Sequence, residues 1–390
     1  MLTAEGELDL GQPVERLVVE GAWLVDPFSD REGAADVEIR AGRISALTWH
    51  EDQAASDGAL LVVPALIDLS STPDKQPAAA AHGGFANVVG AAEQQLLGIA
   101  SAHPPLAAAA SAGVPATILG LPAVGPEVEV ENAAQLIEEL RQRAHESGPA
   151  DAAPLHLAHV STAATLDLVR AARADRLPIS CDVTISQICL HDGWLAGDRR
   201  FSWTAVEAPW SGQSTDAPPY HPATRLEPPL RAPDEARALA AALADGTVSV
   251  LTSGHRPRAG HELEWPYAEL EPGISALETC LPLALAAVDA GLLPLSVVVR
   301  SLTTAPAAIA HLALPPLAVG TVAQLVIVDL RAEWRVDEES LQSAAHNTPL
   351  LGHHLRGRVL ATIVDGRLSW QDRAFAQSGA ETREGSSALR

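Results

Sequence analysis

The sequence predicts an α/β fold, with a body of parallel strands covered by helices and a smaller β unit built from both ends of the chain. Through the middle of the chain, short apolar runs alternate with amphipathic, alanine-rich segments, which is typical of buried parallel strands that alternate with helices. Near both ends, apolar and polar residues alternate at period two, as they do in antiparallel strands with one solvated face.

The β unit is predicted from four alternating segments, 17–24, 35–47, 323–328 and 358–368. Asp365-Gly366 is a strong signal for a tight hairpin turn. We therefore expect residues 17–62 and 316–370 to form one composite β-sandwich. The polar residues 371–390 are expected to form a disordered tail.

We expect residues 63–315 to form the β/α body. The apolar runs that predict strands are 61–69, 85–89, 116–119, 155–160, 179–185 and 248–252. The segments with the clearest helical periodicity are 130–145, 163–174, 233–244 and 274–290. Stretches rich in proline, glycine or polar residues predict long loops at 209–219 and 256–272.

Composition narrows the classes of partner. A chain of 390 residues with 47% hydrophobic residues should be globular, and its net charge of −23 disfavours binding to nucleic acid or to anionic membrane surfaces. No apolar run approaches the roughly 20 residues that span a bilayer, and the first residues do not resemble a secretory signal. We expect a cytoplasmic protein. Cys181, Cys189 and Cys280 lack CxxC spacing, which predicts reduced, buried thiols.

A series of motifs then points to a family. In order, they are Val63-Pro64-Ala65-Leu66-Ile67-Asp68, His159-Val160-Ser161-Thr162, Pro228-Pro229-Leu230-Arg231, Ala244-Asp245-Gly246-Thr247, Glu271-Pro272-Gly273-Ile274 and Asn347-Thr348-Pro349. With these motifs in this order, the chain resembles the dihydroorotase branch of the amidohydrolase superfamily over residues 17–370. The resemblance implies that the body is a TIM-type (β/α) barrel.

The resemblance also implies a metal site that this chain has lost. Family members carry a His-x-His pair at the end of the first barrel strand, where this chain has Ser70 and Thr72. They carry a catalytic aspartate at the end of the eighth strand, where Gly254 stands here. Zinc selects imidazole, thiolate and carboxylate, so hydroxyl groups are poor replacements. We therefore expect no bound metal and no cofactor.

Other site positions are altered as well. Asp74 and Glu227 stand where the family has an arginine and an asparagine that bind the substrate carboxylate, so two anions replace the groups that this carboxylate needs. His159 is the only position that still resembles a metal ligand, and His255 follows Gly254. One imidazole does not hold a catalytic ion, so structural roles are expected for both histidines.

The barrel is expected to be shortened or irregular. The interval between Leu66 and His159 has room for about three β/α units of ~30 residues, whereas the family places five units there. An incomplete barrel exposes strand edges and apolar surface that a loop, a helix or another subunit must cover. We therefore expect a homo- or hetero-oligomer.

Within the family, the chain most resembles the noncatalytic dihydroorotase-like partners of bacterial aspartate carbamoyltransferase. This resemblance implies a scaffold role in pyrimidine biosynthesis, with the catalytic chain of that enzyme as the partner. Two alternatives remain open. One is an active cyclic amidohydrolase, with or without a metal, that uses a rearranged site around His159 and His255. The other is a sensor that binds a small anion at Arg256 and Arg258.

Overall fold

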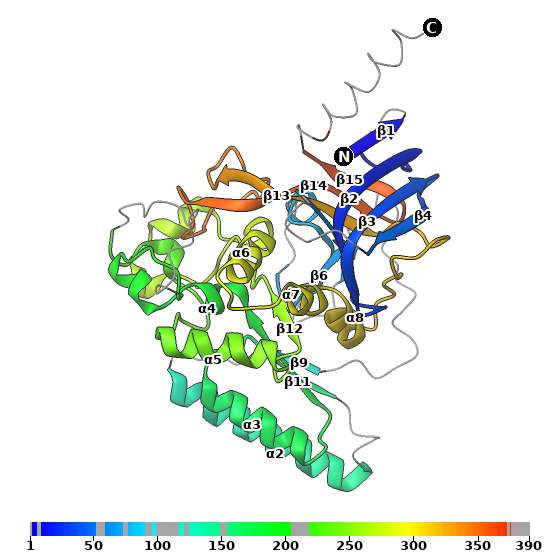
Figure 1. The fold of residues 1–390 in the computed structure, drawn as a ribbon. Coiled ribbons are helices and arrows are strands. Elements are labelled where there is room, and N and C mark those ends of the chain that lie inside the picture. Colours follow the sequence, from blue (N-terminus) through cyan, green and yellow to red (C-terminus); the bar gives the residue numbers. More distant parts are fainter. Residues whose placement is uncertain are drawn as a thin grey trace, which may run out of the picture.

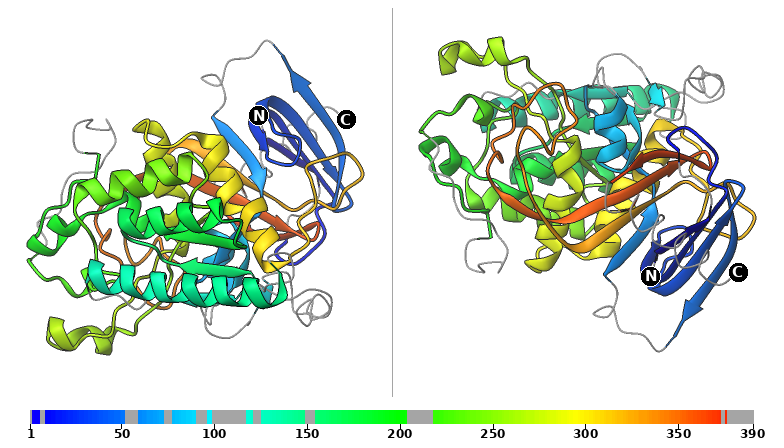
Figure 2. Two further views of the ribbon diagram at one scale, coloured as in Figure 1. Left: turned by 90° about the horizontal axis from the view of Figure 1, so that it is seen from below. Right: turned by 90° about the horizontal axis from the view of Figure 1, so that it is seen from above.

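The computed structural model describes residues 2–5, 9–51, 59–72, 77–89, 96–98, 117–120, 125–148, 154–203, 218–372 and 375. Within these residues the chain is an α/β protein with three sheets (Figure 1). One sheet is formed by the two ends of the chain, and the other two belong to the body between them. Figure 2 shows the N-terminal strands beside the body, with the C-terminal strands crossing between them.

The terminal sheet has eight strands in the order β15-β14-β13-β5-β2-β3-β4, and β1 pairs with β2. The strands are β1 (Leu2–Glu5), β2 (Arg16–Asp26), β3 (Arg31–Arg40), β4 (Arg43–His50), β5 (Leu60–Pro64), β13 (Leu325–Arg335), β14 (His354–Val364) and β15 (Arg367–Gln371). Strand β5 joins the two halves, because it pairs with β2 on one side and with β13 on the other.

Two hairpin turns of the terminal sheet touch. The turn that contains Gly42 joins β3 to β4, and the turn that contains Gly366 joins β14 to β15. Val14 and Ala323 each bridge the two turns. The Gly42 N–H donates to the Val14 carbonyl and the Val14 N–H donates to the Gly366 carbonyl, while the Gly366 N–H donates to the Ala323 carbonyl and the Ala323 N–H donates to the Gly42 carbonyl. A Cβ atom on Gly42 would lie 2.8 Å from the carbonyl oxygen of Gly366. Glycine is therefore required at this approach.

The body contains a four-stranded parallel sheet in the order β12-β11-β10-β9. Its elements are β9 (Thr117–Gly120), β10 (Leu155–Ala158), β11 (Ile179–Thr184), β12 (Val250–Thr252) and the helices α2 (Pro126–Ser147), α3 (Ala163–Ala174), α4 (Ile185–Cys189) and α5 (Pro233–Ala244). Proline at the first turn of α2 and α5 suits positions whose N–H groups have no helical partner. Thr162 caps α3 by accepting from the Thr165 N–H.

The third sheet has the order β6-β7-β8, with β6 parallel to β7 and β8 antiparallel to β7. It comprises β6 (Leu66–Leu69), β7 (Phe85–Val89) and β8 (Leu96–Gly98), and α1 (Pro77–His82) precedes β7. Strands β6 and β12 lie side by side and are joined by side chains. The strands of the described residues do not close into a barrel.

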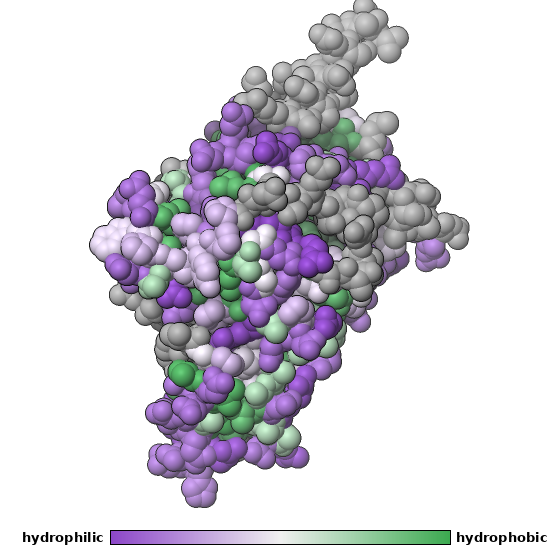
Figure 3. Space-filling view, turned by 90° about the vertical axis from the view of Figure 1, so that its left-hand side faces the viewer, coloured by the Kyte–Doolittle hydropathy of each residue, from purple (hydrophilic) through white to green (hydrophobic). Residues whose placement is uncertain are grey.

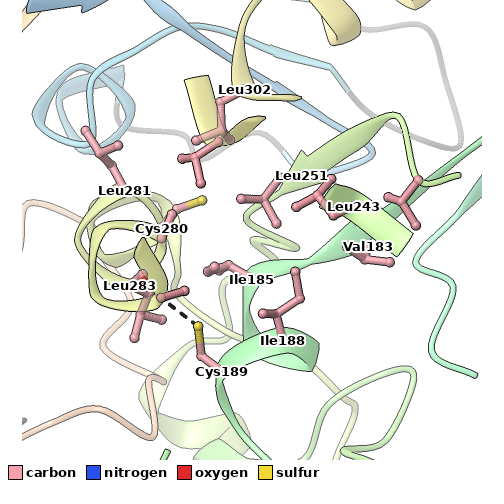
Figure 4. Close-up of a cluster of buried hydrophobic side chains, with 14 of the residues drawn as sticks. Val183, Ile185, Ile188, Cys189, Leu243, Leu251, Cys280, Leu281, Leu283 and Leu302 are labelled. Carbon is pink, nitrogen blue, oxygen red and sulfur yellow. Dashed lines mark hydrogen bonds between the residues drawn. The ribbon is translucent and has the colours of Figure 1, made fainter. Parts of the chain in front are cut away.

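Three more helices complete the body, α6 (Leu277–Asp289), α7 (Leu295–Leu302) and α8 (Thr304–Ala310). Helix α6 packs with α4 and β11–β12 in the apolar core of Figure 4, where Cys189 donates from its thiol to the Leu283 carbonyl. Burial raises the pKa of Cys181, Cys189 and Cys280, so all three are neutral thiols. The surface differs from this core, since hydrophilic residues dominate the face in Figure 3.

The prediction that the disordered tail begins at residue 371 is wrong. Gln371 ends β15, Asp372 is buried and pairs with Arg358 at 2.8 Å, and Phe375 is buried. This part of the expected tail is therefore held against the terminal sheet. The sheet also begins earlier than residue 17, because β1 pairs with β2. Residues 209–217 of the expected loop and all of residues 376–390 lie outside the described residues.

The approach of the two turns can be tested with a matched pair of glycines. Gly42 and Gly21 both have positive φ, +72° and +62°, but a Cβ atom on Gly21 would meet nothing within 4 Å. We expect Gly21→Ala to lower the free energy of unfolding by about 1 kcal/mol through backbone strain alone. Gly42→Ala should cost about 3 kcal/mol, since a collision with backbone adds to the strain. Urea denaturation measures both values, and equal losses would contradict the contact.

Candidate functional site

The sequence-predicted site residues lie just beyond the carboxyl ends of three body strands. Ser70 and Thr72 follow β6, His159 follows β10, and Gly254 and His255 follow β12. Parallel strands present their loops at this edge, which is where α/β folds build their sites. Ser70, His159 and Gly254 all have positive φ, +66°, +58° and +65°. For Ser70 and His159, which are not glycines, this conformation is strained, and such strain is concentrated at functional sites of proteins.

A buried carboxylate, Asp182 on β11, joins the segments that follow β6 and β10. Its Oδ2 accepts from the Ser70 hydroxyl at 2.7 Å and from His156 Nε2 at 2.9 Å, and its Oδ1 accepts from the His159 backbone N–H at 2.6 Å. His156 is fixed in turn, because its Nδ1 lies 2.7 Å from the Ser180 hydroxyl. The donors therefore hold Asp182 from β6, β10 and the loop after β10.

This environment keeps Asp182 ionised. Burial on its own would raise the pKa of its carboxyl, but the hydrogen bond from His156, the charges of His159 and His156 and the backbone donor together lower it below its ordinary value. A buried charge is stable only where partners compensate for lost hydration. Asp182 is therefore a structural anion, and its oxygens are already engaged by donors.

A second buried carboxylate, Asp68, fastens β6 to β12. Its Oδ1 accepts from the Thr252 hydroxyl at 2.7 Å and from the Ser253 N–H at 2.8 Å, and its Oδ2 accepts from the Ser253 hydroxyl. Beyond the strand ends, the Thr72 N–H donates to the His255 carbonyl at 2.7 Å. These bonds replace the missing backbone ladder between the two strands.

A third buried carboxylate, Glu129 in the first turn of α2, holds the loop after β10. It accepts from the N–H groups of Ser161 and Thr162 at 3.0 and 3.1 Å and from both hydroxyls. The Arg231 guanidinium lies 3.6 Å from Glu129 and donates to the Ser161 hydroxyl at 3.0 Å. Two of the sequence motifs, 159–162 and 228–231, thus meet at one ion pair.

Gly254 occupies a position with no room for a side chain. A Cβ atom there would lie 2.8 Å from Cγ2 and 3.2 Å from Cβ of Thr184, and the positive φ adds strain. A side chain at this position would require either Thr184 or the backbone after β12 to move. The local structure around Gly254 therefore favours glycine over the expected aspartate.

The positions expected to face a substrate carboxylate carry no free cation among the described residues. Glu227 forms an ion pair with Arg256 at 3.0 Å. Arg258 donates from Nε and from its terminal nitrogen to the Pro272 carbonyl at 3.1 and 3.0 Å. Both arginines therefore serve the loop itself, which disfavours an anion sensor built from them. Asp74 lies outside the described residues.

The two residual histidines differ in their surroundings. His255 is buried, and its Nδ1 accepts from the Ala276 N–H at 3.1 Å, so one ring nitrogen is used to fix the start of α6. The Nε2 atom of His159 is buried and has no hydrogen-bond partner. The structure brings both residues to the same edge as Ser70, where His159 is held through its backbone N–H and His255 through a ring nitrogen.

The donor set of the described residues does not fit a divalent transition metal. Ser70 is engaged by Asp182, Gly254 has no donor, and Asp182 is saturated by three donors. In the part of the chain that the structure describes, no three His, Cys, Asp or Glu side chains are grouped so that they could hold a metal. Catalytic zinc requires about three protein ligands, so these residues do not support a metal-dependent step.

Sequence reasoning did not predict the hydrogen bonds that organise this edge. Asp68 gave a signal, because a lone carboxylate inside an apolar strand must be satisfied by buried donors. The cross-strand neighbours His156 and Ser180 could be found only after the register of β10 and β11 was known. Nothing local in the sequence connects Glu129 with Ser161.

Comparison with curated proteins finds partial similarity to dihydroorotases. The dihydroorotase of Pelobacter propionicus is 31% identical over 218 residues, which cover 56% of this chain and 46% of that protein. That of Anaeromyxobacter dehalogenans is 36% identical over 214 residues, with coverage of 55% and 45%. The matched part thus spans about half the length of these relatives. No protein-family model matches the chain.

Comparison with solved structures shows the fold. The dihydropyrimidinase of Brevibacillus agri aligns with a TM-score of 0.63 at 15% identity, covering 90% of this chain and 94% of that one. The D-hydantoinase of a Thermus species aligns with a TM-score of 0.63 at 16% identity, covering 91% and 95%. The α/β architecture is thus that of hydantoinases and dihydropyrimidinases. No helix in the described ranges combines the length and apolarity that crossing a membrane requires.

The role of Asp182 can be tested by removing its charge. Asp182→Asn places an amide donor against existing donors, and we expect it to lower the free energy of unfolding by about 3 kcal/mol. Ser180→Ala is the matched control, since it removes one neutral partner of His156 and should cost about 1 kcal/mol. Urea denaturation at neutral pH compares them, and an Asp182→Asn protein as stable as wild type would contradict the role.

The same pair gives a test by pH. Because the folded-state pKa of Asp182 is lowered, its contribution is fully present above the ordinary value near 3.8 and is lost as the pH falls through the folded-state pKa. Wild type and Ser180→Ala should therefore lose stability over this acid range more steeply than Asp182→Asn. Parallel acid-unfolding curves for all three proteins would count against an ionised Asp182.

Proposed function

We propose that this chain is a noncatalytic dihydroorotase-like protein that supports the assembly of aspartate carbamoyltransferase in the cytoplasm. In this proposal residues 63–315 form a shortened TIM-type barrel, and residues 17–62 and 316–370 form one composite β unit. The observation that carries it is the edge around Asp182. Ser70 and Gly254 occupy positions where the resemblance expects metal chemistry, and hydrogen bonds tie these segments together instead.

The chemistry of ring-amide hydrolysis explains why this edge favours a noncatalytic role. Such hydrolysis requires an activated water, stabilisation of the developing oxyanion and a base that carries the proton. At this edge Asp182 is held by three donors, and Asp68 is buried among Thr252 and Ser253. Neither carboxylate is available as a base, because each is part of the link between strands.

Retention of the body supports a role for its surface. The segments at the carboxyl ends of β6, β10 and β12 are fastened by three buried carboxylates, although each buried charge needs several donors to be stable. The partial identity to dihydroorotases supports placing the role in pyrimidine biosynthesis. An aspartate carbamoyltransferase catalytic chain is the proposed partner, in a hetero-oligomer.

A second candidate is a cyclic amidohydrolase with a rearranged site, active on a C–N bond. The buried His159 Nε2 without a hydrogen-bond partner favours it, since an imidazole nitrogen at the strand ends is available to exchange a proton. This candidate predicts turnover that depends on His159. The first proposal predicts none.

Metal analysis and assay separate the two candidates. We expect the purified chain to carry no stoichiometric zinc and to leave dihydroorotate unchanged. Restoring the lost groups with Ser70→His, Thr72→His and Gly254→Asp together should not create a zinc site, because the side chain at 254 collides with Thr184. Gly254→Ala is the control, as it has the same collision without the carboxylate. Stoichiometric zinc in the unaltered chain, or dihydroorotate turnover that is lost on His159→Ala, would favour the second candidate. Zinc bound by the triple variant would contradict the effect of the collision at position 254.

Co-expression tests the scaffold role directly. We expect the aspartate carbamoyltransferase catalytic chain of the same organism to elute with this chain on size exclusion, and its assembly to unfold at a higher temperature in its presence, because a ligand of the folded state stabilises it. Asp182→Asn, which loosens the strand ends, should weaken this effect. A carbamoyltransferase that assembles and works equally well alone, and never elutes with the chain, would overturn the proposal.

A further inference from the structure

The loop after β12 forms a projection whose base is firmly held. Its first residues are tied back, because the Arg256 N–H donates to the Ile274 carbonyl at 2.7 Å and the Arg258 guanidinium donates to the Pro272 carbonyl. Between these points, residues 260–264 and 267–269 form single 3₁₀ turns, η4 and η5. Exposed aromatic side chains lie on this projection and on the segment beside it.

Three aromatic rings and two glutamates define what we call the aromatic–acidic patch: Tyr220, Glu264, Trp265, Tyr267 and Glu269. Trp265 is 60% exposed and Tyr220 is 63% exposed, although large aromatic rings are usually covered. The rings of Tyr220 and Tyr267 meet edge to face with centroids 5.4 Å apart. The patch therefore joins two segments that are distant in sequence.

The two tyrosines of the patch are held in place before any partner binds. The Tyr267 hydroxyl donates to the Thr224 carbonyl at 3.2 Å, and the Tyr220 N–H donates to the Leu195 carbonyl at 2.7 Å. Rigid aromatic side chains lose little entropy on association, so they make effective anchors. Tryptophan and tyrosine are also the residues that most often dominate the energy of protein interfaces.

The charge of the patch specifies the chemistry of its partner. Glu264 and Glu269 have no ion pair with any residue that the structure describes. The Arg225 guanidinium lies over the Tyr267 ring, 5.8 Å from its centroid, and aromatic faces of this kind attract cations. Unpaired carboxylates beside exposed aromatic faces fit arginine or lysine side chains. The rings of Trp265 and Tyr220 are exposed rather than recessed, which suits a protein face better than a small ligand.

We propose that the aromatic–acidic patch is the docking surface for a partner-protein face that presents arginine or lysine side chains. This inference rests on the proposed function, in which the partner is the aspartate carbamoyltransferase catalytic chain. The net charge of −23 favours the encounter with such a face at low ionic strength.

The test measures affinity between the full-length chain and the catalytic chain of the same organism by isothermal titration. Trp265→Ala should weaken binding roughly thirtyfold, as truncation of an interface anchor does. Glu264→Lys with Glu269→Lys should weaken binding at low ionic strength and make the affinity less dependent on salt. Val319→Ala is the control, because Val319 is 62% exposed on the terminal β unit, outside the patch. All variants change exposed side chains, and unfolding temperatures equal to wild type verify their folding.

The outcomes separate this inference from the proposed function. If wild type binds and the patch variants bind equally well, the patch is excluded as the docking surface and the scaffold role stands. If wild type does not bind the catalytic chain at all, both are overturned. Weakened binding by the patch variants with unchanged binding by Val319→Ala supports the patch.

Discussion

The arrangement of the body depends on the bonds that converge on Asp182. One side chain on β11 receives donors from the end of β6, from within β10 and from the loop after it. In a low-dielectric interior such an anion is costly when alone and strongly ordering when satisfied, since every donor must keep its place. The backbone strain at Ser70 and His159 persists because these donors fix both residues.

Asp68 and Glu129 extend the same principle to neighbouring segments. Asp68 connects β6 with β12, where the described strands share no regular ladder, and Glu129 connects α2 with the loop after β10 and with Arg231. An edge organised in this way is rigid without an ion, and its carboxylates are unavailable for proton transfer. The hydrogen bonds that hold this edge together thus also remove the groups that catalysis would need, which agrees with the proposed scaffold role.

Much of the architecture could be predicted from the sequence. The periodicity of residues 163–174 and 233–244 predicted α3 and α5, and alternation predicted strands at both ends, because these patterns arise from local geometry. The pairing of β5 with both β2 and β13 could not be predicted in this way, since it depends on contacts between distant residues. Ser70 was recognised as a replaced position, but its bond to Asp182 depends on how β6 and β11 meet. Residue 371 was placed in a tail because its polar neighbours hid the buried Phe375.

The position of β5 also affects how the chain is made. The ribosome releases β2, β3 and β5 long before β13, which completes the other side of β5. Until then a nascent chain carries a strand with an open hydrogen-bonding edge and an apolar surface, the kind of site at which chains aggregate. Synthesis of some 260 further residues separates the two halves of this sheet, by the numbering of Pro64 and Leu325. Chaperone binding during translation would thus matter more for the first sixty residues than for the body that follows them.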